Sequence, residues 1–381
     1  MQLSRFTPNF GNFHPNPPHS RHHGTRDISQ CAQLISCYHH HGQNGKFAPD
    51  FRWRTLFPND FTTKTPAMTD TAKLRIGTRG SPLALAQAHE VRDKLAKAHP
   101  ELAEDGAIAI TVITTTGDKI LDRALSEIGG KGLFTKEIDD ALMGGEIDLA
   151  VHSMKDVPTV LPDGMILPTI LPREDVRDAF ISLKYKSFAE MPAGSVIGSA
   201  SLRRQAMILN KYSNLKVVTF RGNVQTRLRK LGEEQVDATL LAMAGLNRLG
   251  QPEIATAPIA EDDMLPAVAQ GAIGITIREE DQQTKDWLAA LHCEKSAIRV
   301  AAERAALKAL DGSCRTPIAA LAEFNDDGSM RLRVSIVRPD GSERLDTERL
   351  IAKPDMASAA AVGTDAGEEL KQRGGPDFIS A

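Results

Sequence analysis

Three stretches of the sequence repeat one arrangement, in which a short strand pattern runs into a turn of small residues and a helical pattern follows at once. They are Leu74–Arg79, Ser195–Ser201 and Val217–Asn223. After the first of them, Ser81 is placed to cap a helix whose first residue is Pro82, a position at which proline is favoured. Strand, turn and helix in repeated succession are typical of parallel strands covered by helices, so the sequence predicts an α/β fold.

Further strands and helices are predicted between these three stretches. Ile108–Thr116 and Leu149–Met154 are predicted to be strands, the second of them apolar enough for the centre of a covered sheet. In the helix that follows Ser201, the residues Leu202, Ala206 and Leu209 recur at helical spacing and are expected to form the buried face.

The chain is predicted to consist of an N-terminal extension, two α/β domains and a small α+β domain. We expect these parts at residues 1–72, at 73–176 together with about 269–290, at 177–268 and at 291–381. The strand predicted at Gly271–Arg278 is assigned to the first α/β domain. The elements expected in the last domain are a helix at Cys293–Leu310, antiparallel strands at Ile318–Phe324, Met330–Arg338 and Glu343–Ile351, and a helix at Ala357–Arg373.

The extension differs in composition from the rest of the chain. Residues 1–67 hold seven of the 11 histidines, seven of the 13 phenylalanines and no glutamate, and no helical or strand period runs through them, so we expect disorder. The scarcity of acidic residues is typical of a transit peptide, but serine is scarce and aromatic residues are frequent. Cys31, Cys37 and the nearby histidines match no standard zinc spacing. We favour a misassigned start, with Met68 as the first residue.

Charge and cysteine content exclude several classes of protein. The formal net charge of −3 gives no electrostatic reason to expect nucleic acid or an anionic membrane as a partner. No apolar run reaches the length of a membrane span. Four cysteines in 381 residues are too few for a disulfide framework and favour a reducing compartment. We therefore expect a cytoplasmic monomer without a metal, or a plastid protein if the extension is a genuine transit peptide.

The three strand-to-helix turns share a chemistry. Arg79-Gly80-Ser81, Ser199–Arg204 and Arg221-Gly222-Asn223 each put arginine beside the start of a helix, and Arg227 follows Asn223 by one helical turn. Free backbone N–H groups and the helix dipole favour anions at such a position, and a guanidinium binds carboxylate or phosphate through two hydrogen bonds. Since ligands bind at the carboxyl ends of strands in such sheets, three of these turns predict a cleft for a ligand with several negative charges.

A second polar sequence, Val151–Pro158, stands at the exit of the strand predicted at Leu149–Met154. Lys155 and Asp156 admit two interpretations: a surface ion pair that contributes little, or a carboxylate directed into the cleft to face a developing cation. The residues alone leave both open. His152, a lone histidine within a strand, is expected to be structural rather than a general base.

Nucleotide-binding motifs are not found in the sequence. Gly129–Gly132 lacks the remaining residues of a P-loop, and no G-x-G-x-x-G opens the first helix. Cys314 then remains unexplained, because it stands in a Gly/Ser/Pro turn after a long helical pattern, with neither a zinc spacing nor a protease signature around it.

Together these motifs resemble the porphobilinogen deaminase family, whose members are also called hydroxymethylbilane synthases. The resemblance covers about residues 73–381 and rests on motifs that occur in the order of the family. These motifs are Thr78–Ala84, Gly130–Phe134, Val151–Pro158, Ser201–Arg204, Arg221–Asn223, Ala244–Leu249 and Gly312–Cys314. The resemblance implies two domains like those of periplasmic binding proteins and a third domain that carries the cysteine on a loop.

The resemblance also implies a reaction and its residues. Cys314 would hold a dipyrromethane cofactor through a thioether, and four porphobilinogen molecules would be joined head to tail on this primer with loss of ammonia, before water releases hydroxymethylbilane for haem biosynthesis. Asp156 would be catalytic, facing the pyrrole N–H groups and the positive charge that develops. The residues implied to hold the cofactor are Ser153, Lys155, Ser199, Ser201, Arg203 and Arg204. Those implied to hold substrate are Arg79, Ser81, Lys131, Arg221, Gly222, Arg227, Arg248 and Gln270.

Two other classes of function are weighed against this one. A carboxylate-binding module with the same fold would need no Cys314, and a zinc or redox protein using Cys293 and Cys314 has little support, since a thiol at a helix start is explained by packing. Glu127 stands four residues before Lys131, where the family leads us to expect lysine. The sequence leaves open the proton donor to ammonia and the way in which elongation stops at four units.

Overall fold

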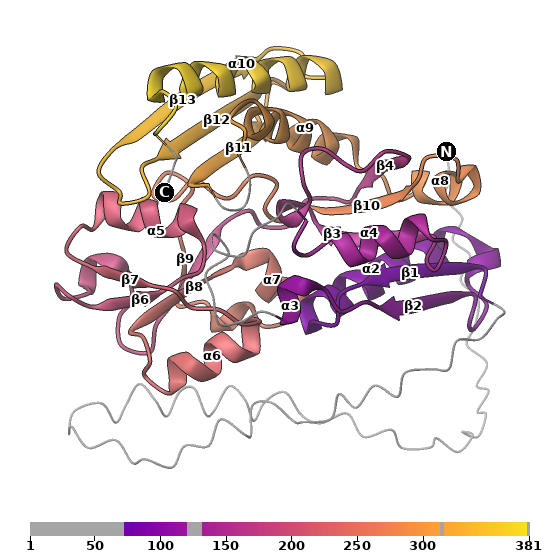
Figure 1. Cartoon of the computed structure of the whole chain (residues 1–381), viewed down its shortest axis with the longest axis horizontal. Coiled ribbons are helices and arrows are strands. Elements are labelled where there is room, and N and C mark those ends of the chain that lie inside the picture. Colours follow the sequence, from indigo (N-terminus) through magenta and orange to yellow (C-terminus); the bar gives the residue numbers. More distant parts are fainter. Residues whose placement is uncertain (1–71, 120–131, 313–315, 379–381) are drawn as a thin grey trace, which may run out of the picture. The chain divides into compact units, whose positions relative to one another are not determined.

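The structure, a computed structural model, describes residues 72–119, 132–312 and 316–378. Within these ranges the chain forms two five-stranded sheets and one three-stranded sheet, with helices packed against them (Figure 1). The α/β class predicted from the strand–turn–helix repeats is confirmed. The extension up to residue 71, Glu127, Lys131 and Cys314 lie outside the described residues, so the expectations for them are carried forward as predictions.

The first sheet has the strand order β2-β1-β3-β10-β4. Its strands are β1 (Leu74–Thr78), β2 (Ile108–Val112), β3 (Leu149–Ser153), β4 (Met165–Ile170) and β10 (Ile273–Arg278). β1 pairs in parallel with β2 and β3, whereas β10 is antiparallel to β3 and β4. The strand predicted at Ile108–Thr116 ends early, because Thr116 begins the short helix α3. The hydroxyl and the backbone N–H of Thr116 donate hydrogen bonds to Glu137. The hydroxyl and the backbone N–H of Thr115 donate hydrogen bonds to Asp118.

The second sheet repeats this pattern with the order β7-β6-β8-β5-β9. Its strands are β5 (Asp178–Ile181), β6 (Val196–Gly198), β7 (Lys216–Val218), β8 (Ala238–Ala242) and β9 (Ala257–Pro258). β6 is parallel to β7 and β8, and β5 is antiparallel to β8 and β9. In both sheets, therefore, the carboxyl ends of three neighbouring parallel strands lie along one edge.

The third sheet is a simple antiparallel meander of β11 (Ile318–Phe324), β12 (Met330–Val337) and β13 (Arg344–Ile351). Its two turns contain Gly328 and Gly341 at φ +84° and +79°, which is the left-handed region that glycine adopts without strain. The strands and turns agree with the prediction to within a residue at either end.

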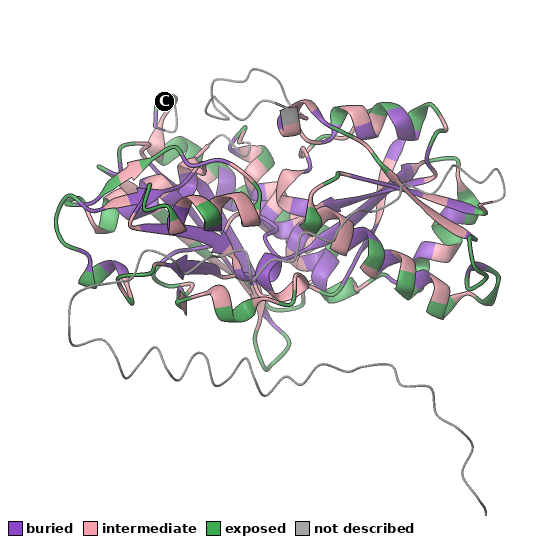
Figure 2. Cartoon of the chain, turned by 90° about the horizontal axis from the view of Figure 1, so that it is seen from below, coloured by how far each residue is buried: buried purple, intermediate pink, exposed green. Residues whose placement is uncertain are grey.

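Helices cover the sheets, and buried side chains are concentrated in the strands between them (Figure 2). The helices are α2 (Pro82–Ala98), α3 (Thr116–Lys119), α4 (Lys136–Met143), α5 (Leu202–Lys211), α6 (Val224–Gly232), α7 (Met243–Arg248), α8 (Gln282–Ala289), α9 (Glu294–Ala309) and α10 (Met356–Gly374). No helix among the described residues is long and apolar enough to cross a bilayer.

The face predicted for α5 is confirmed only at Ala206, which is completely buried. Leu202 and Leu209 are only partly buried, whereas Arg203 and Arg204 are 4% and 5% exposed. A hydrophobic pattern assigns arginine to the solvent side, but here both guanidinium groups meet a buried carboxylate inside the protein.

Two chain segments connect the first sheet to the second, residues 171–177 on the way out and 259–272 on the way back. Glu303 of α9 binds both of them. It pairs with Arg173 at 2.5 and 2.9 Å and accepts a hydrogen bond from the N–H of Ala269 at 2.7 Å. A further hydrogen bond, from the N–H of Ala322 at 2.8 Å, ties β11 to the same carboxylate. The ion pair is almost completely buried, with side-chain exposures of 1% and 0%.

Candidate active site

A cavity of about 580 Å³ opens where the carboxyl ends of the parallel strands in both sheets meet the beginning of β11. Seven cationic side chains and two carboxylates, those of Asp118 and Asp156, are among the described residues that line it. The predicted site residues on its wall are Arg79, Ser81, Ser153, Lys155, Asp156, Ser201, Arg203, Arg204, Arg221, Gly222, Arg227, Arg248 and Gln270. Thr316, two residues after Cys314 in the sequence, also lines it. The predicted convergence of the arginine-bearing turns is therefore found.

The capping side chain predicted at Ser81 is found, and the other two turns also have a capping side chain at the helix start. Ser81 Oγ accepts a hydrogen bond from the N–H of Ala84 at 3.2 Å, which caps α2. Ser201 caps α5 and Asn223 caps α6 in the same way, at 3.4 and 2.9 Å. Because each cap satisfies only part of its helix start, further N–H groups stay available for an anion.

Ser199 is the one described site residue that does not reach the cavity wall. It is 2% exposed and lies beneath the turn, where its Oγ accepts a hydrogen bond from the N–H of Ser201 at 3.2 Å. The geometry corrects the expectation of a direct contact with a ligand, since the short side chain is already bonded within its own turn. Its role is to shape the start of α5.

Arg79 is held in place by a partner that the sequence did not reveal. Its Nε lies 3.2 Å from both carboxylate oxygens of Asp118, and the ring of Phe134 packs against its guanidinium at 4.2 Å. Burial alone would raise the pKa of Asp118, but hydrogen bonds from Arg79 and Thr115 hold that pKa below its usual value. Asp118 is thus ionised, and it orients a guanidinium that remains at the edge of the cavity. Phe134 also lines the cavity.

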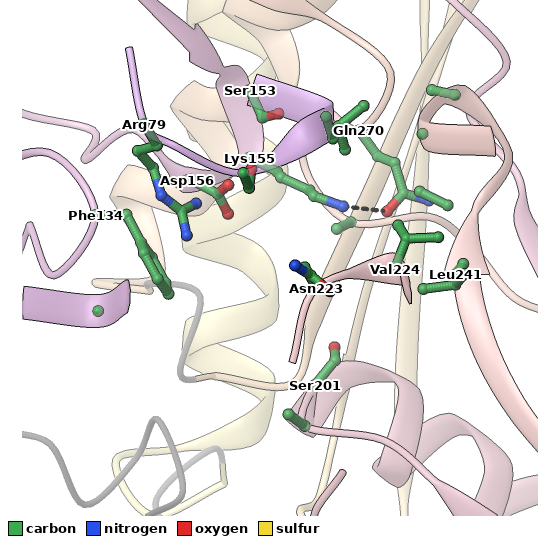
Figure 3. A pocket seen from close by; sticks show the side chains of 18 of the residues that line it. Arg79, Phe134, Ser153, Lys155, Asp156, Ser201, Asn223, Val224, Leu241 and Gln270 are labelled. Carbon is green, nitrogen blue, oxygen red and sulfur yellow. Dashed lines mark hydrogen bonds between the residues drawn. The ribbon is translucent and has the colours of Figure 1, made fainter. Parts of the chain in front are cut away.

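Lys155 and Asp156 follow β3 in a single 3₁₀ turn, Met154–Asp156. Figure 3 shows them with Arg79 on one side of the cavity, across from Ser201 and Asn223. Burial lowers the pKa of Lys155 to about 8, against the opposing effect of Asp156. The side chain of Lys155 donates to Oε1 of Gln270 at 3.4 Å. Of the two interpretations of Asp156, the structure favours the carboxylate in the cleft over the surface ion pair.

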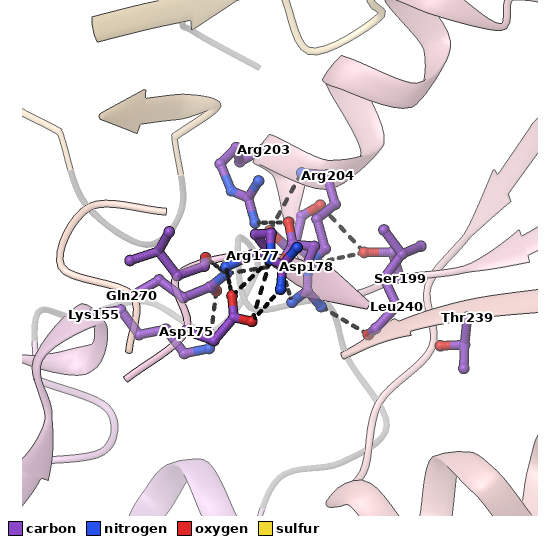
Figure 4. A network of polar contacts seen from close by, with 12 residues as sticks. Lys155, Asp175, Arg177, Asp178, Ser199, Arg203, Arg204, Thr239, Leu240 and Gln270 are labelled. Carbon is purple, nitrogen blue, oxygen red and sulfur yellow. Dashed lines mark hydrogen bonds and ion pairs between the residues drawn. The ribbon is translucent and has the colours of Figure 1, made fainter. Parts of the chain in front are cut away.

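Arg203 and Arg204 surround Asp178, a residue that sequence reasoning missed (Figure 4). Asp178 is the first residue of β5 and is 0% exposed. Each guanidinium lies 2.7 Å from a different oxygen of its carboxylate. The only sequence signal is an acidic residue immediately before the apolar Ala179–Ile181, and such a residue is ordinarily assigned to the surface.

Two further arginines of the wall, Arg227 and Arg248, are held by backbone carbonyls. Arg227 donates from Nε to the carbonyl of Gly222 at 2.9 Å, and burial together with Arg204 and Arg221 lowers its pKa to about 10. Arg248 lies 3.4 Å from Glu90 and donates to the carbonyl of Gly271. A site with this surplus of cations is suited to a ligand that carries several carboxylates.

Two candidates from the sequence, His152 and Cys293, do not line the cavity. His152 is 6% exposed, its Nε2 lies 2.9 Å from Oγ1 of Thr276, and complete burial lowers its pKa to about 4, so it is neutral. Cys293 occupies the N-cap position of α9, where its partly exposed side chain makes no capping hydrogen bond and its N–H donates to the carbonyl of Ile170 at 2.8 Å. Among the described residues, no group of His, Cys, Asp and Glu is arranged to hold a metal ion.

Two family models match this chain. "Porphobilinogen deaminase, dipyromethane cofactor binding domain" matches residues 74–286, and "Porphobilinogen deaminase, C-terminal domain" matches residues 297–372. The chain belongs to the porphobilinogen deaminase family. This confirms the resemblance seen in the motifs, and with it a transferase of tetrapyrrole biosynthesis whose first matched region is the one that binds dipyrromethane.

Curated relatives agree with this assignment over most of their length. The chloroplastic porphobilinogen deaminase of Oryza sativa subsp. japonica is 61% identical over 308 residues, which are 81% of this chain and 86% of the relative. The porphobilinogen deaminase of Paracoccus denitrificans is 57% identical over 306 residues, 80% of this chain and 96% of the relative. Among solved structures, a periplasmic substrate-binding protein of an ABC transporter from Coxiella burnetii is similar over 58% of this chain and 93% of its own, with a TM-score of 0.36 and 16% identity.

Proposed function

We propose that this porphobilinogen deaminase joins four porphobilinogen molecules head to tail, with loss of one ammonia for each, on a dipyrromethane primer attached to Cys314. Water then releases hydroxymethylbilane. The observation that carries the proposal is the cavity in which seven cationic side chains surround the carboxylate of Asp156. Each pyrrole unit brings an acetate and a propionate, so the growing chain is a polyanion that matches this charge.

The described residues fit the cofactor that the family implies. Arg203 is 4% exposed, lines the cavity, and its Nε has no hydrogen-bond partner among the described residues. A buried guanidinium with an unused N–H is suited to a carboxylate of a bound ligand. Gly222, at φ +131°, leaves its turn open, since a Cβ there would lie 2.6 Å from the side chain of Thr226. Cys314 lies outside the described residues.

We assign the primer to the side of the cavity formed by Ser153, Lys155, Ser201, Arg203 and Arg204. When bound, the dipyrromethane supplies the pyrrole carbon to which the first substrate unit is added. Lys155 and the two arginines hold its carboxylates. The incoming substrate is assigned to the other cationic groups, which are Arg79, Ser81, Arg221, Gly222, Arg227 and Arg248, together with Lys131. The side chain of Gln270 is bonded to other residues and acts through them.

Asp156 is the catalytic residue of this proposal. Asp156 directly follows Lys155 in the 3₁₀ turn after β3. It lines the same cavity as the seven cationic side chains. Positive charge develops on the substrate as ammonia leaves and as the new carbon–carbon bond forms. A preorganised carboxylate stabilises that charge and accepts hydrogen bonds from the pyrrole N–H groups. The cations around it hold the ligand carboxylates away from Asp156 and fix the reacting carbons in position.

The proposal is tested by intact mass and turnover of the purified protein from a haem-competent host. We expect a mass increase of two pyrrole units on Cys314, absent in Cys314→Ser, and release of ammonia from porphobilinogen. A carboxylate-binding module would bind porphobilinogen with an unmodified mass and without releasing ammonia, and that result would exclude the enzyme.

Three further points belong to the proposal. We propose a monomer, and the domain limits given above, which agree with the strand membership of the three sheets. We propose the cytoplasm as the location, with a plastid as the alternative; the rice and pea relatives are named chloroplastic, and the one from Paracoccus is not. Expression of residues 1–72 fused to a fluorescent protein in plant cells distinguishes the two locations.

A further inference from the structure

Asp178 touches the site without belonging to its wall. It is completely buried at the start of β5, and it is not among the residues that line the cavity, yet three residues that do line it are bonded to its carboxylate. Oδ2 accepts from Arg203 at 2.7 Å, and Oδ1 accepts from Arg204 at 2.7 Å and from Nε2 of Gln270 at 2.9 Å. Figure 4 shows the group at the centre of this network.

We propose that Asp178 is a positioning residue of the reaction: its carboxylate sets the orientation of Arg203 and Arg204 and, through Gln270, the place of Lys155. The inference deepens the proposed function and rests on it, because these are the groups assigned to the carboxylates of the primer.

The geometry fixes both guanidinium planes. Besides its bond to Asp178, Arg203 donates from Nη1 to the carbonyl of Leu265 at 2.8 Å. Arg204 donates from Nη1 to the carbonyl of Leu240 at 2.8 Å. Two acceptors in different directions leave a planar guanidinium one orientation, so the N–H groups that remain unused point to a fixed place.

The same carboxylate sets the net charge of the arginine pair. Two guanidinium groups and one carboxylate leave a single positive charge, which one ligand carboxylate neutralises. Without Asp178, two like charges would share a buried space, which is a costly arrangement that the side chains would relieve by moving apart. The consequence is a misplaced primer rather than a weaker attraction for anions.

Gln270 extends the network to Lys155. Its Nε2 donates to Asp178 and to the carbonyl of Val176 at 2.8 Å, and its Oε1 accepts from Lys155 at 3.4 Å. The charged groups that act on Lys155 are Asp156 and Asp178, which raise its pKa, and Arg203 and Arg204, which lower it. The pKa of Lys155 is about 8 with Asp178 ionised. Loss of the charge on Asp178 should therefore lower this pKa further.

The test compares Asp178→Asn with Asp148→Asn in the full-length, cofactor-loaded protein. Asp148 is a matched control, because its carboxylate also binds two arginines, Arg75 at 2.6 Å and Arg278 at 3.5 Å, but neither of these arginines lines the cavity. For each molecule of loaded protein, we expect Asp178→Asn to reduce kcat about 100-fold, as misplacement of a reacting group does, with KM changed less than about threefold. Asp148→Asn is expected to keep both constants and to lose only stability.

A second readout separates positioning from a merely structural role. The alkaline limb of the pH–rate profile should move to lower pH in Asp178→Asn and stay in place in Asp148→Asn. If Asp178→Asn does not fold, Asp178→Glu is used instead. This variant keeps the charge but displaces it by one methylene. It should therefore show the loss in kcat without the shift of the pH–rate profile. Wild-type kcat in Asp178→Asn, or in Asp178→Glu, overturns the inference.

A crystal structure of the variant provides a readout that does not depend on turnover. We expect the guanidinium groups of Arg203 and Arg204 to be displaced in Asp178→Asn by about 1 Å or more, a distance that matters for catalysis. If the wild-type protein releases no ammonia from porphobilinogen, the proposed function fails, and this comparison still decides whether Asp178 positions the pair. Unmoved guanidinium groups would refute the positioning role.

Discussion

Glu303→Gln tests how the segments between the two large sheets are held. The substitution keeps the size of the side chain and removes the charge of a carboxylate that accepts four hydrogen bonds, two from Arg173 and one each from Ala269 and Ala322. Both members of the ion pair are buried, so water cannot replace the lost partner.

The magnitude follows from these contacts. A buried guanidinium left without its counter-charge costs about 3–5 kcal/mol. The amide NH₂ that replaces one oxygen also faces two donors that it cannot bond, one from Arg173 and one backbone N–H, which adds about 1–3 kcal/mol. Allowing for relaxation, we expect a loss of about 4–6 kcal/mol in the free energy of unfolding. Domains as a rule have only about 5–15 kcal/mol of stability, so the variant should be close to unfolding at 25 °C.

Urea unfolding followed by circular dichroism measures this loss. The control is Glu323→Gln, since Glu323 makes comparable contacts with Arg333 at 2.8 Å and Arg331 at 3.5 Å but is 34% exposed. We expect less than about 1 kcal/mol there. If Glu303→Gln unfolds within about 1 kcal/mol of the wild type, the buried pair is not what holds the connecting segments, and the reasoning is wrong.

Three further predictions concern the site and its surroundings. Asp156→Ala should keep the fold, as judged by circular dichroism, and lose about 10²–10³ in kcat, because one preorganised electrostatic partner of the transition state is removed; normal turnover excludes Asp156 from the mechanism. Activity should fall as the pH rises through about 8, where Lys155 loses the proton with which it holds a carboxylate, and Lys155→Arg, which stays charged, should move this limb to higher pH in a pH–rate profile. His152 binds a proton below about pH 4 when folded but below about 6.5 when unfolded, so stability should be lost as the pH falls from about 6.5 to 4, by about 3 kcal/mol in total. His152→Gln should flatten this dependence in urea titrations at several pH values, and an unchanged slope would contradict the assignment.

The parts of the site that the sequence predicts are those that local structure determines. Arg79, Arg221 and the cap residues Ser81 and Ser201 follow strand ends directly, and the carboxyl ends of neighbouring parallel strands always share one edge of a sheet. A local sequence pattern and this rule of sheet topology were enough to predict that these residues line one cavity.

The parts that it does not predict are tertiary partners. Asp118 and Arg79 are 39 residues apart in the sequence, and Glu303 and Arg173 are 130 residues apart. A local sequence pattern cannot predict a contact between residues so far apart. For Asp178 the hydrophobic pattern is misleading as well, because it assigns an acidic residue to the surface. Buried charges become visible only when both partners are placed in space.

The two connections between the large sheets have a mechanical consequence. A domain that is connected to another by a single segment can tilt and twist freely. The first two sheets are connected by two segments, 171–177 and 259–272, and a second connection restricts twisting. Because the carboxylate of Glu303 is bonded to both segments, we expect relative motion of the two sheets to be a rotation about the line that the segments define. Opening and closing about such an axis changes the width of the cavity but keeps the cationic groups of one sheet opposite the same groups of the other. A ligand that lengthens by identical units would thus meet the same pairing of opposed groups at every width.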